Sequence, residues 1–281
     1  MSRGPAPDRA LADLRARART GESAPAVAGV TRTATTLHGV PALCCRPHDL
    51  PDDDRVLLWF HGGGYRLGSA AAFHPWMCGL ARACRIEVLS VDYRLAPEHP
   101  FPEALIDAVL TYSAVLGRRV VVGGESAGGG LAAALLLAAA DRGLTAPAGA
   151  VLCSPWLDLR NAAESFTGNA GTDVLFPRAA ADAAAGLYLA GHRAEDPYAS
   201  PLLGDWADAP PVLVQASTDE SLRDDARSLS EVAPSVRLRL FEGVPHAWHI
   251  GYPQAPASTD AVDDIARFVE EIAPARTGLP A

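Results

Sequence analysis

Short apolar segments rich in β-branched residues alternate along the chain with segments of helical periodicity, and this alternation limits the possible folds most strongly. The β-rich segments are residues 56–60, 86–91, 120–122, 150–153, 212–215 and 236–241. The helical patterns are residues 76–84, 103–116, 127–140, 222–232 and 259–272. Strands that are apolar on both faces are typical of a parallel sheet covered by helices on each side. The sequence therefore predicts an α/β fold with a mostly parallel central sheet flanked by helices.

Two segments interrupt the alternation, and we expect them to form a small helical cap. The first is residues 1–30, with an Arg- and Ala-rich helix near Asp8 to Arg19; the second is residues 159–208, with an Ala-rich helix at residues 178–190. A connection as long as the second one is usually functional when it lies within a compact domain. The core is then expected to comprise residues 31–158 and 209–281, and 281 residues suffice for such a domain with an insertion.

Composition excludes several classes of function. Hydrophobic residues make up 49% and charged residues 20%, as in a globular protein, and the net charge of −9 disfavours nucleic acid as a partner. The most apolar run, residues 131–140, is too short to span a membrane, and residues 1–19 lack the apolar centre of an export signal. Five cysteines without metal-ligand spacing indicate reduced thiols, so a cytoplasmic protein is expected.

Ser126 is the candidate nucleophile. It stands in the pentapeptide Gly-Glu-Ser-Ala-Gly at residues 124–128, directly after a predicted strand and directly before a long predicted helix. A serine at such a sharp strand-to-helix turn is held exposed, and its small neighbours let the turn close and a substrate approach. The pentapeptide alone is weak, since it also occurs in structural glycine turns. The strand and helix around it favour the nucleophile.

A glycine loop at residues 61–65, His-Gly-Gly-Gly-Tyr, follows the predicted strand at residues 56–60. A tetrahedral oxyanion needs donors that already point at it, and the N–H groups of a glycine loop provide them without side-chain bulk. The N–H groups of Gly63, Gly64 and Ala127 are therefore predicted to form the oxyanion hole. A flexible surface loop is the alternative, but it would not need a histidine and an aromatic residue at its ends.

An activated serine requires a base, and His246 is the prediction. His246 and His249 both follow the last predicted strand, where the turn at residues 242–245 would carry the chain over the carboxyl edge of the sheet. The other six histidines belong to loop-like segments, to the glycine loop or to a proline-rich stretch upstream of the serine. His246 is preferred because it is nearer the apex of the loop, and His249 is interpreted as a surface or supporting residue.

The acid that orients the histidine should follow the predicted strand at residues 212–215, since the order along the chain is serine, acid, histidine. Asp219 is the choice there. Glu220, Asp224 and Asp225 are the alternatives, of which the last two fall in the following predicted helix, where they would lie on a solvated face or pair with the helix dipole.

With these residues the sequence resembles the hormone-sensitive-lipase branch of the α/β hydrolases, a bacterial esterase family. Besides the glycine loop and the serine pentapeptide, the resemblance rests on residues 92–102 (DYRLAPEHPFP), 154–159 (SPWLDL), 199–202 (ASPL) and 210–214 (PPVLV). It runs from about residue 57 to residue 268. The resemblance implies the α/β-hydrolase fold, Ser126, Asp219 and His246 as a catalytic triad, the three oxyanion donors named above, and a cap built from the N-terminus and the stretch after Trp156.

The sequence departs from this branch at several positions. Glu125 stands where Asp is more frequent, Gly130 stands where Asn is frequent, and Glu220-Ser221 follows the predicted acid in place of the commoner proline. The part before the glycine loop is also shorter than usual. These departures leave the predicted triad intact. The residue differences are expected to affect substrate preference, and the short N-terminal part is expected to make the cap smaller.

The expected function is that of a serine carboxylic ester hydrolase that acts on a small-molecule acyl ester through an acyl-enzyme. This chemistry requires neither a metal nor an organic cofactor. Two alternatives remain: an amide or lactone hydrolase or tailoring enzyme of a biosynthetic pathway, and a non-catalytic ligand-binding member of the fold, against which the complete triad argues. Members of the branch often dimerise, so a homodimer is left open, because no residue decides the oligomeric state.

The pocket is expected to be lined by aromatic and aliphatic side chains that shelter an acyl chain, namely Tyr65, Trp76, Trp156, Leu175 and Phe176. Each buried methylene contributes about 0.8 kcal/mol until the pocket is full. Because the N-terminal part is short, we expect a small pocket and a preference for acyl chains of roughly two to eight carbons.

Overall fold

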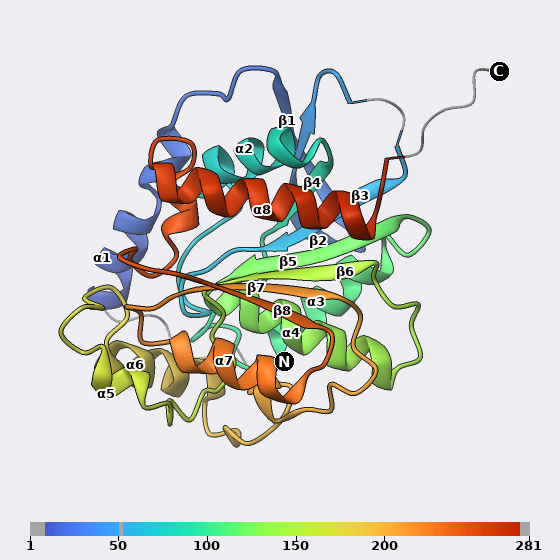
Figure 1. Cartoon of the computed structure of the whole chain (residues 1–281). Helices are drawn as coiled ribbons and strands as arrows, with labels where there is room; N and C mark the ends of the chain where they lie inside the picture. Colours follow the sequence, from blue (N-terminus) through green and yellow to red (C-terminus); the bar gives the residue numbers. More distant parts are fainter. Residues whose placement is uncertain (1–8, 51–52, 276–281) are drawn as a thin grey trace.

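An eight-stranded sheet forms the centre of the structure, a computed structural model that describes residues 9–50 and 53–275 (Figure 1). The strand order is β1-β2-β4-β3-β5-β6-β7-β8. The strands are β1 Val30–Leu37, β2 Val40–Pro47, β3 Arg55–Phe60, β4 Glu87–Val91, β5 Arg119–Glu125, β6 Gly149–Cys153, β7 Val212–Ser217 and β8 Val236–Phe241. All neighbours from β4 to β8 pair in parallel, which confirms the predicted mostly parallel sheet.

The two N-terminal strands were not predicted. β1 and β2 form an antiparallel hairpin, and β2 adds to the edge of the sheet by antiparallel pairing with β4. β1 consists largely of threonine and other polar residues and is mostly exposed, so it lacks the continuous apolar character that marks a strand buried on both faces. β2 contains two prolines, which are tolerated near the ends of a strand but weaken a prediction of one.

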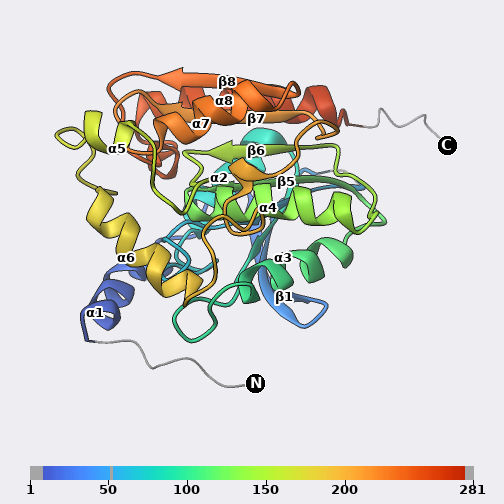
Figure 2. The same cartoon turned by 90° about the horizontal axis from the view of Figure 1, so that it is seen from below.

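Helices cover both faces of the sheet. One face carries α2 (His74–Cys84) and α8 (Pro256–Ile272), and the other carries α3 (Glu103–Ser113), α4 (Ala127–Asp141) and α7 (Arg223–Val232) (Figures 1 and 2). Each matches a predicted helix within a few residues. Nearly all of α4 is buried between the sheet and its neighbours, so this helix can hold the residue that precedes it in one place. The helices and sheet confirm the predicted α/β-hydrolase architecture.

The two segments expected to form a cap are helical. The first contains α1 (Arg9–Ala18) and a short 3-10 turn at Thr20–Ser23; the second contains α5 (Ser165–Gly168), α6 (Arg178–Leu189) and a 3-10 turn at Pro201–Leu203. Both views place α1 and α6 at the same end of the sheet (Figures 1 and 2). Asp8, the predicted start of the first helix, and the rest of residues 1–8 lie outside the described residues, as do residues 51–52 and 276–281. The division into cap and core stays a prediction.

The structure also shows whether a helix could span a membrane and what state the cysteines have. Among the helices of the described residues, none combines the length and the apolar character needed to cross a membrane. All five cysteines are free thiols, four of them buried.

Candidate active site

Ser126 lies at the turn between β5 and α4, in a backbone conformation that side chains rarely adopt. Its φ of 56° and ψ of −122° are outside the regions that most residues occupy, which is typical of the strained turn that presents a nucleophile. The turn depends on its glycines, because a Cβ on Gly128 would overlap the backbone carbonyl of Phe60. The N–H of Ser126 donates to the carbonyl of Cys153 at 2.9 Å, which fixes the turn to β6.

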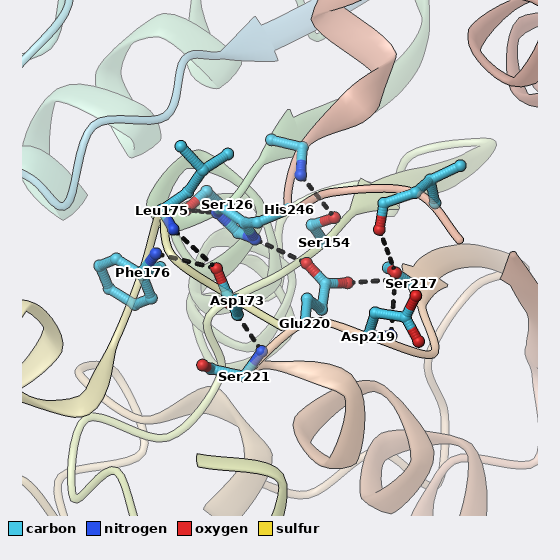
Figure 3. A network of polar contacts seen from close by, with 12 residues as sticks. Ser126, Ser154, Asp173, Leu175, Phe176, Ser217, Asp219, Glu220, Ser221 and His246 are labelled. Atoms are coloured by element: carbon cyan, nitrogen blue, oxygen red, sulfur yellow. Dashed lines mark hydrogen bonds and ion pairs between the residues drawn. The ribbon is translucent and has the colours of Figure 1, made fainter. Parts of the chain in front are cut away.

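His246 lies against Ser126, as expected for its base. Its Nε2 is 2.9 Å from the Oγ of Ser126, and its Nδ1 is 2.6 Å from Oε2 of Glu220 (Figure 3). The loop that carries it is held by the N–H of Ala247, which donates to the Oγ of Ser154 at 3.2 Å. The structure thus places a hydroxyl, an imidazole and a carboxylate in one continuous hydrogen-bonded chain.

His249 does not reach this chain. Its side chain is fully buried, and its Nε2 lies 3.1 Å from Oε1 of Gln215 on β7. Burial lowers the pKa of His249 to about 3, with a smaller contribution from His246. His249 is therefore a neutral core residue. Of the two interpretations that the sequence left open, a surface residue or a supporting residue, the structure excludes the surface residue.

The acid beside His246 is Glu220, which corrects the expectation of Asp219. Glu220 is fully buried, and its second oxygen, Oε1, accepts from the N–H of Ser217 at 2.7 Å. The carboxylate of Asp219 instead accepts from the N–H of Gly243 at 3.1 Å and from the hydroxyl of Thr218. Figure 3 shows that His246 is bonded to Glu220 and not to Asp219.

The reason for this correction is the length of β7. The strand continues through Ser217, two residues beyond the predicted end, and Ser217 still pairs with Phe241. The turn therefore comprises Thr218 and Asp219, and the next residue, Glu220, is the one that faces inward. The other two alternatives are structural: Asp225 is buried and accepts from the N–H groups of Leu157 and Asp158, and Asp224 pairs with Arg223.

The environment of His246 favours its protonated form. Burial lowers the pKa of His246, but the hydrogen bond and the negative charge of Glu220 outweigh burial, and the pKa is raised above its ordinary value. Asp173 and Glu125 add to the negative potential. The ring of Phe176 stacks on the imidazole with centroids 5.6 Å apart, which shields it from water. An imidazole held in this way can accept a proton from Ser126 and remain paired as an imidazolium.

Asp173 also belongs to the site, although no pattern in the sequence points to it. It is buried, and it accepts hydrogen bonds from the N–H groups of Leu175 and Phe176 at 3.1 and 3.0 Å and from that of Ser221 at 2.7 Å (Figure 3). One carboxylate thus joins the loop that carries Phe176 to the turn that carries Glu220. No short motif marks its contact with the turn of Glu220, because that partner, the N–H of Ser221, is 48 positions away in the sequence.

The glycine loop, residues 61–65, lies beside Ser126 and offers backbone N–H groups as hydrogen-bond donors. Gly63 and Gly64 have φ values of 118° and 61°, and a Cβ on Gly63 would collide with the backbone of Leu67. Within the part of the chain that the structure describes, the N–H groups of Gly63 and Gly64 have no hydrogen-bond partner. The third predicted donor, the N–H of Ala127, is at the first position of α4, where no partner within the helix is possible.

A buried carboxylate holds this loop. Oε1 of Glu125 accepts from the N–H of Gly62 at 2.6 Å, and its Oε2 accepts from Nε1 of Trp59 at 2.5 Å. Burial raises the pKa of Glu125 to about 7, against the opposing effect of these two hydrogen bonds. Glu125 is the residue noted above as a departure from the commoner Asp.

A cavity of about 350 Å³ opens over Ser126. Its walls come from the glycine loop, from α1, from residues 175–180 and from the loop after His246. Leu175 and Phe176 line it, as predicted. The lining that the sequence did not suggest consists of Leu14, Arg66, Leu67, Phe73, Ala180, Ala247 and Ile250.

Tyr65, Trp76 and Trp156 do not line this cavity, contrary to expectation. Tyr65 stacks face to face on Tyr188 with centroids 3.8 Å apart, and Trp156 donates from Nε1 to Asn161. Trp76 is buried on the α2 side of the sheet, edge-on to Trp59. All three side chains belong to the buried core.

Known proteins resemble this chain over most of its length. Residues 57–250 match a family described as having the alpha/beta hydrolase fold. An acetyl-hydrolase of Streptomyces hygroscopicus is 39% identical over 226 residues, which cover 77% of this chain and 76% of that protein. An esterase of Acinetobacter venetianus is 34% identical over 78% of this chain and 75% of its own. The crystal structure of an esterase from the bacterial hormone-sensitive lipase family superimposes with a TM-score of 0.90 at 36% identity and covers 95% of this chain and 93% of that one.

Proposed function

The chain belongs to the α/β-hydrolase family, in the branch of the bacterial hormone-sensitive-lipase-like esterases, and is a carboxylesterase-type enzyme; we propose that it works through an acyl-enzyme formed on Ser126. The observation that carries the proposal is the hydrogen-bonded chain from Ser126 through His246 to Glu220, with distances of 2.9 and 2.6 Å. A serine, a histidine and a buried carboxylate in this order are the parts that nucleophilic catalysis needs.

In the first half of the reaction, the Oγ of Ser126 attacks the ester carbonyl while Nε2 of His246 takes the serine proton. The negative charge that develops on the carbonyl oxygen is stabilised by the N–H groups of Gly63, Gly64 and Ala127. His246 then gives the proton to the departing alcohol, and Ser126 keeps the acyl group. In the second half, His246 takes a proton from water, and the resulting attack releases the acid and restores the serine.

Glu220 has the role for which the sequence suggested Asp219. Its Oε2 accepts from Nδ1–H of His246, so Nε2 is the unprotonated nitrogen that faces Ser126. This contact fixes the tautomer and stabilises the imidazolium during the reaction. Because Glu220 also accepts from Ser217, its carboxylate has one orientation in the turn.

The substrate's acyl group is proposed to be short to medium in length, with roughly two to eight carbons. The cavity of about 350 Å³ is bounded by the apolar side chains of Leu14, Leu175, Phe176 and Ile250. Added methylenes increase binding until the chain passes this apolar boundary and meets solvent. The related acetyl-hydrolase is named for the shortest acyl group in this range.

A series of p-nitrophenyl esters from acetate to palmitate tests the proposal on the wild-type enzyme and on Ser126→Ala. We expect a maximum of kcat/KM between about two and eight carbons and a loss of at least a thousandfold, in order of magnitude, in Ser126→Ala. The matched control is Ser230→Ala, which should leave the rates unchanged. It removes a hydroxyl on α7 whose hydrogen bond, in the described part of the chain, goes to the carbonyl of Arg227 in the same helix. An active Ser126→Ala enzyme would contradict the nucleophile, and a maximum at palmitate would contradict the proposed chain length.

A further inference from the structure

Arg66 lines the same cavity as Ser126, and nothing in the described part of the chain pairs with its charge. The Nε of Arg66 is completely buried without a hydrogen-bond partner. No carboxylate of residues 9–50 and 53–275 lies within ion-pairing distance of its guanidinium. The neighbouring arginines differ in this respect: Arg15 pairs with Glu98 at 2.6 Å, and Arg94 pairs with Asp107 at 2.8 Å.

A partly buried guanidinium without a charged partner lowers the stability of the folded protein. Burial lowers the pKa of Arg66, and no acidic group offsets that effect. An arginine side chain nevertheless stays charged at neutral pH, so a partly desolvated cation remains in the cavity. A charge that is retained without a partner in a substrate cavity is a candidate for binding a group on the substrate.

The backbone of Arg66 is held in place next to the reaction centre. The N–H of Arg66 donates to the carbonyl of Gly63 at 3.2 Å, and its carbonyl accepts from Nε of Arg15 at 2.9 Å. The Nε of Arg66 lies only 3.7 Å from the place where a Cβ on Gly64 would be. Arg66 is thus built into the same turn as the proposed oxyanion donors, and its guanidinium is close to one of them.

The other charged groups of the cavity are already engaged. Both oxygens of Glu125 accept hydrogen bonds, from Gly62 and Trp59, and the imidazole of His246 contacts Ser126 and Glu220. Most of the remaining lining is glycine or apolar. Arg66 therefore supplies an uncompensated positive charge in an otherwise largely apolar cavity, although the whole chain carries a net charge of −9.

We propose that Arg66 binds a carboxylate carried by the substrate, so that the preferred substrates are esters with a free carboxylate, such as the monoesters of short dicarboxylic acids. The guanidinium presents several N–H donors in a planar arrangement that fits a carboxylate. The inference rests on the ester hydrolysis proposed above and adds the class of substrate. A neutral ester of the same shape leaves the charge of Arg66 unmatched and is hydrolysed less efficiently.

The experiment compares the monomethyl esters of succinate, glutarate and adipate with neutral methyl esters in which an isopropyl group replaces the carboxylate. Hydrolysis is followed by titration of the released acid, and the quantity measured is the ratio of kcat/KM for the charged ester to that for its neutral counterpart. Three diacid lengths are used so that a single unsuitable spacing does not decide the result.

For at least one length, the ratio should exceed one in the wild type and fall about 10- to 100-fold in Arg66→Met, the change expected when a hydrogen-bonded charge loses its partner. Arg66→Lys should keep part of the preference. Arg193→Met is the matched control, because it changes the net charge equally at a side chain that is 84% exposed and should leave the ratio unchanged. The Tm of Arg66→Met should not fall, since an unpaired and partly buried charge is removed.

Equal ratios in the wild type and Arg66→Met at all three lengths would overturn the inference and make Arg66 an ordinary solvated arginine at the cavity mouth. The proposed ester hydrolysis would then still be supported by the measured hydrolysis of the neutral esters. If the wild-type enzyme hydrolysed neither kind of ester and Ser126 failed to react with a fluorophosphonate, the proposed function would fall and the inference with it.

Discussion

The backbone N–H of Gly62 donates a 2.6 Å hydrogen bond to Oε1 of Glu125, the residue that directly precedes Ser126. This bond joins the loop with the proposed oxyanion donors to the turn that holds the proposed nucleophile. The other carboxylate oxygen is fixed by Nε1 of Trp59. A change at Glu125 should therefore alter the alignment of donors and nucleophile without touching the substrate.

Glu125→Gln tests this positioning role. A carboxylate accepts from both Gly62 and Trp59, whereas an amide of the same shape must turn its NH₂ toward one of the two donors. We expect kcat to fall about tenfold or more with little change in KM, because oxyanion stabilisation is lost mainly in the transition state. Steady-state kinetics with p-nitrophenyl butyrate gives both quantities.

Adding Trp59→Phe to Glu125→Gln removes one of the two donors, so the amide oxygen is free to accept from Gly62. The double variant should be more active than Glu125→Gln alone, even if it is less stable than the wild type. A wild-type kcat in Glu125→Gln, or a double variant that is no more active than the single one, would contradict the positioning role.

The choice of acid is tested by Glu220→Gln and Asp219→Asn. Glu220→Gln should lower kcat by about a thousandfold or more, since the amide no longer stabilises the imidazolium and can hold the wrong tautomer. Asp219→Asn should stay within about threefold of the wild type, because the carboxylate of Asp219 is hydrogen-bonded, among the described residues, only to the N–H of Gly243 and the hydroxyl of Thr218. If Asp219→Asn were the inactive variant, the geometry found here would not be that of the working enzyme.

The pH dependence follows from His246. The imidazole must be neutral to accept the Ser126 proton, so kcat/KM should rise with pH through the pKa of His246 in the free enzyme. Glu220 raises that pKa, so the midpoint should lie above the ordinary histidine value of about 6.5. Loss of the negative charge in Glu220→Gln should move the midpoint of the residual activity to lower pH. A profile that is flat from about pH 5 to 8 would contradict a histidine base.

Helix α1 is held over the cavity by Arg15, which pairs with Glu98 and also donates to the carbonyls of Arg66 and Ala96. The neighbouring residue on α1, Leu14, lines the cavity. Arg15→Met should raise KM for octanoate esters about 3- to 10-fold while acetate is affected little, since only the longer chain reaches α1.

The matched control for this variant is Arg17→Met, an exposed arginine on the same helix. Kinetics on the acetate and octanoate p-nitrophenyl esters distinguish the two variants. If Arg15→Met changed KM equally for both esters, the contacts of Arg15 would not act through the part of the cavity that binds the end of the acyl chain.

Much of the sheet could be predicted because its central strands are continuous apolar runs, and the glycine loop and Ser126 follow directly from two of them. The hairpin of β1 and β2 could not, since an edge strand of alternating or polar character has no such run. The acid was misplaced by one residue because the end of β7 decides which side chain faces inward, and strand ends are poorly marked in a sequence.

Residues that act through tertiary packing were harder to predict. Asp173 holds backbone groups of two distant segments, and Leu14 and Ile250 reach the cavity only because the chain folds back over it. The aromatic residues Tyr65 and Trp156 near the expected site pack into the core instead. Local patterns were enough to predict Ser126 and His246 of the proposed catalytic chain, whereas its acid and the cavity walls depended on the whole fold.

The most direct test of the central claim is covalent labelling with a fluorophosphonate, followed by intact mass measurement and peptide mapping. The wild-type enzyme should take up one label per chain on Ser126, and Ser126→Ala should take up none. His246→Ala should react far more slowly, because the serine loses its base, whereas His249→Ala should keep a substantial part of the rate. Labelling of another serine, or equal labelling of the wild type and Ser126→Ala, would contradict Ser126 as the nucleophile.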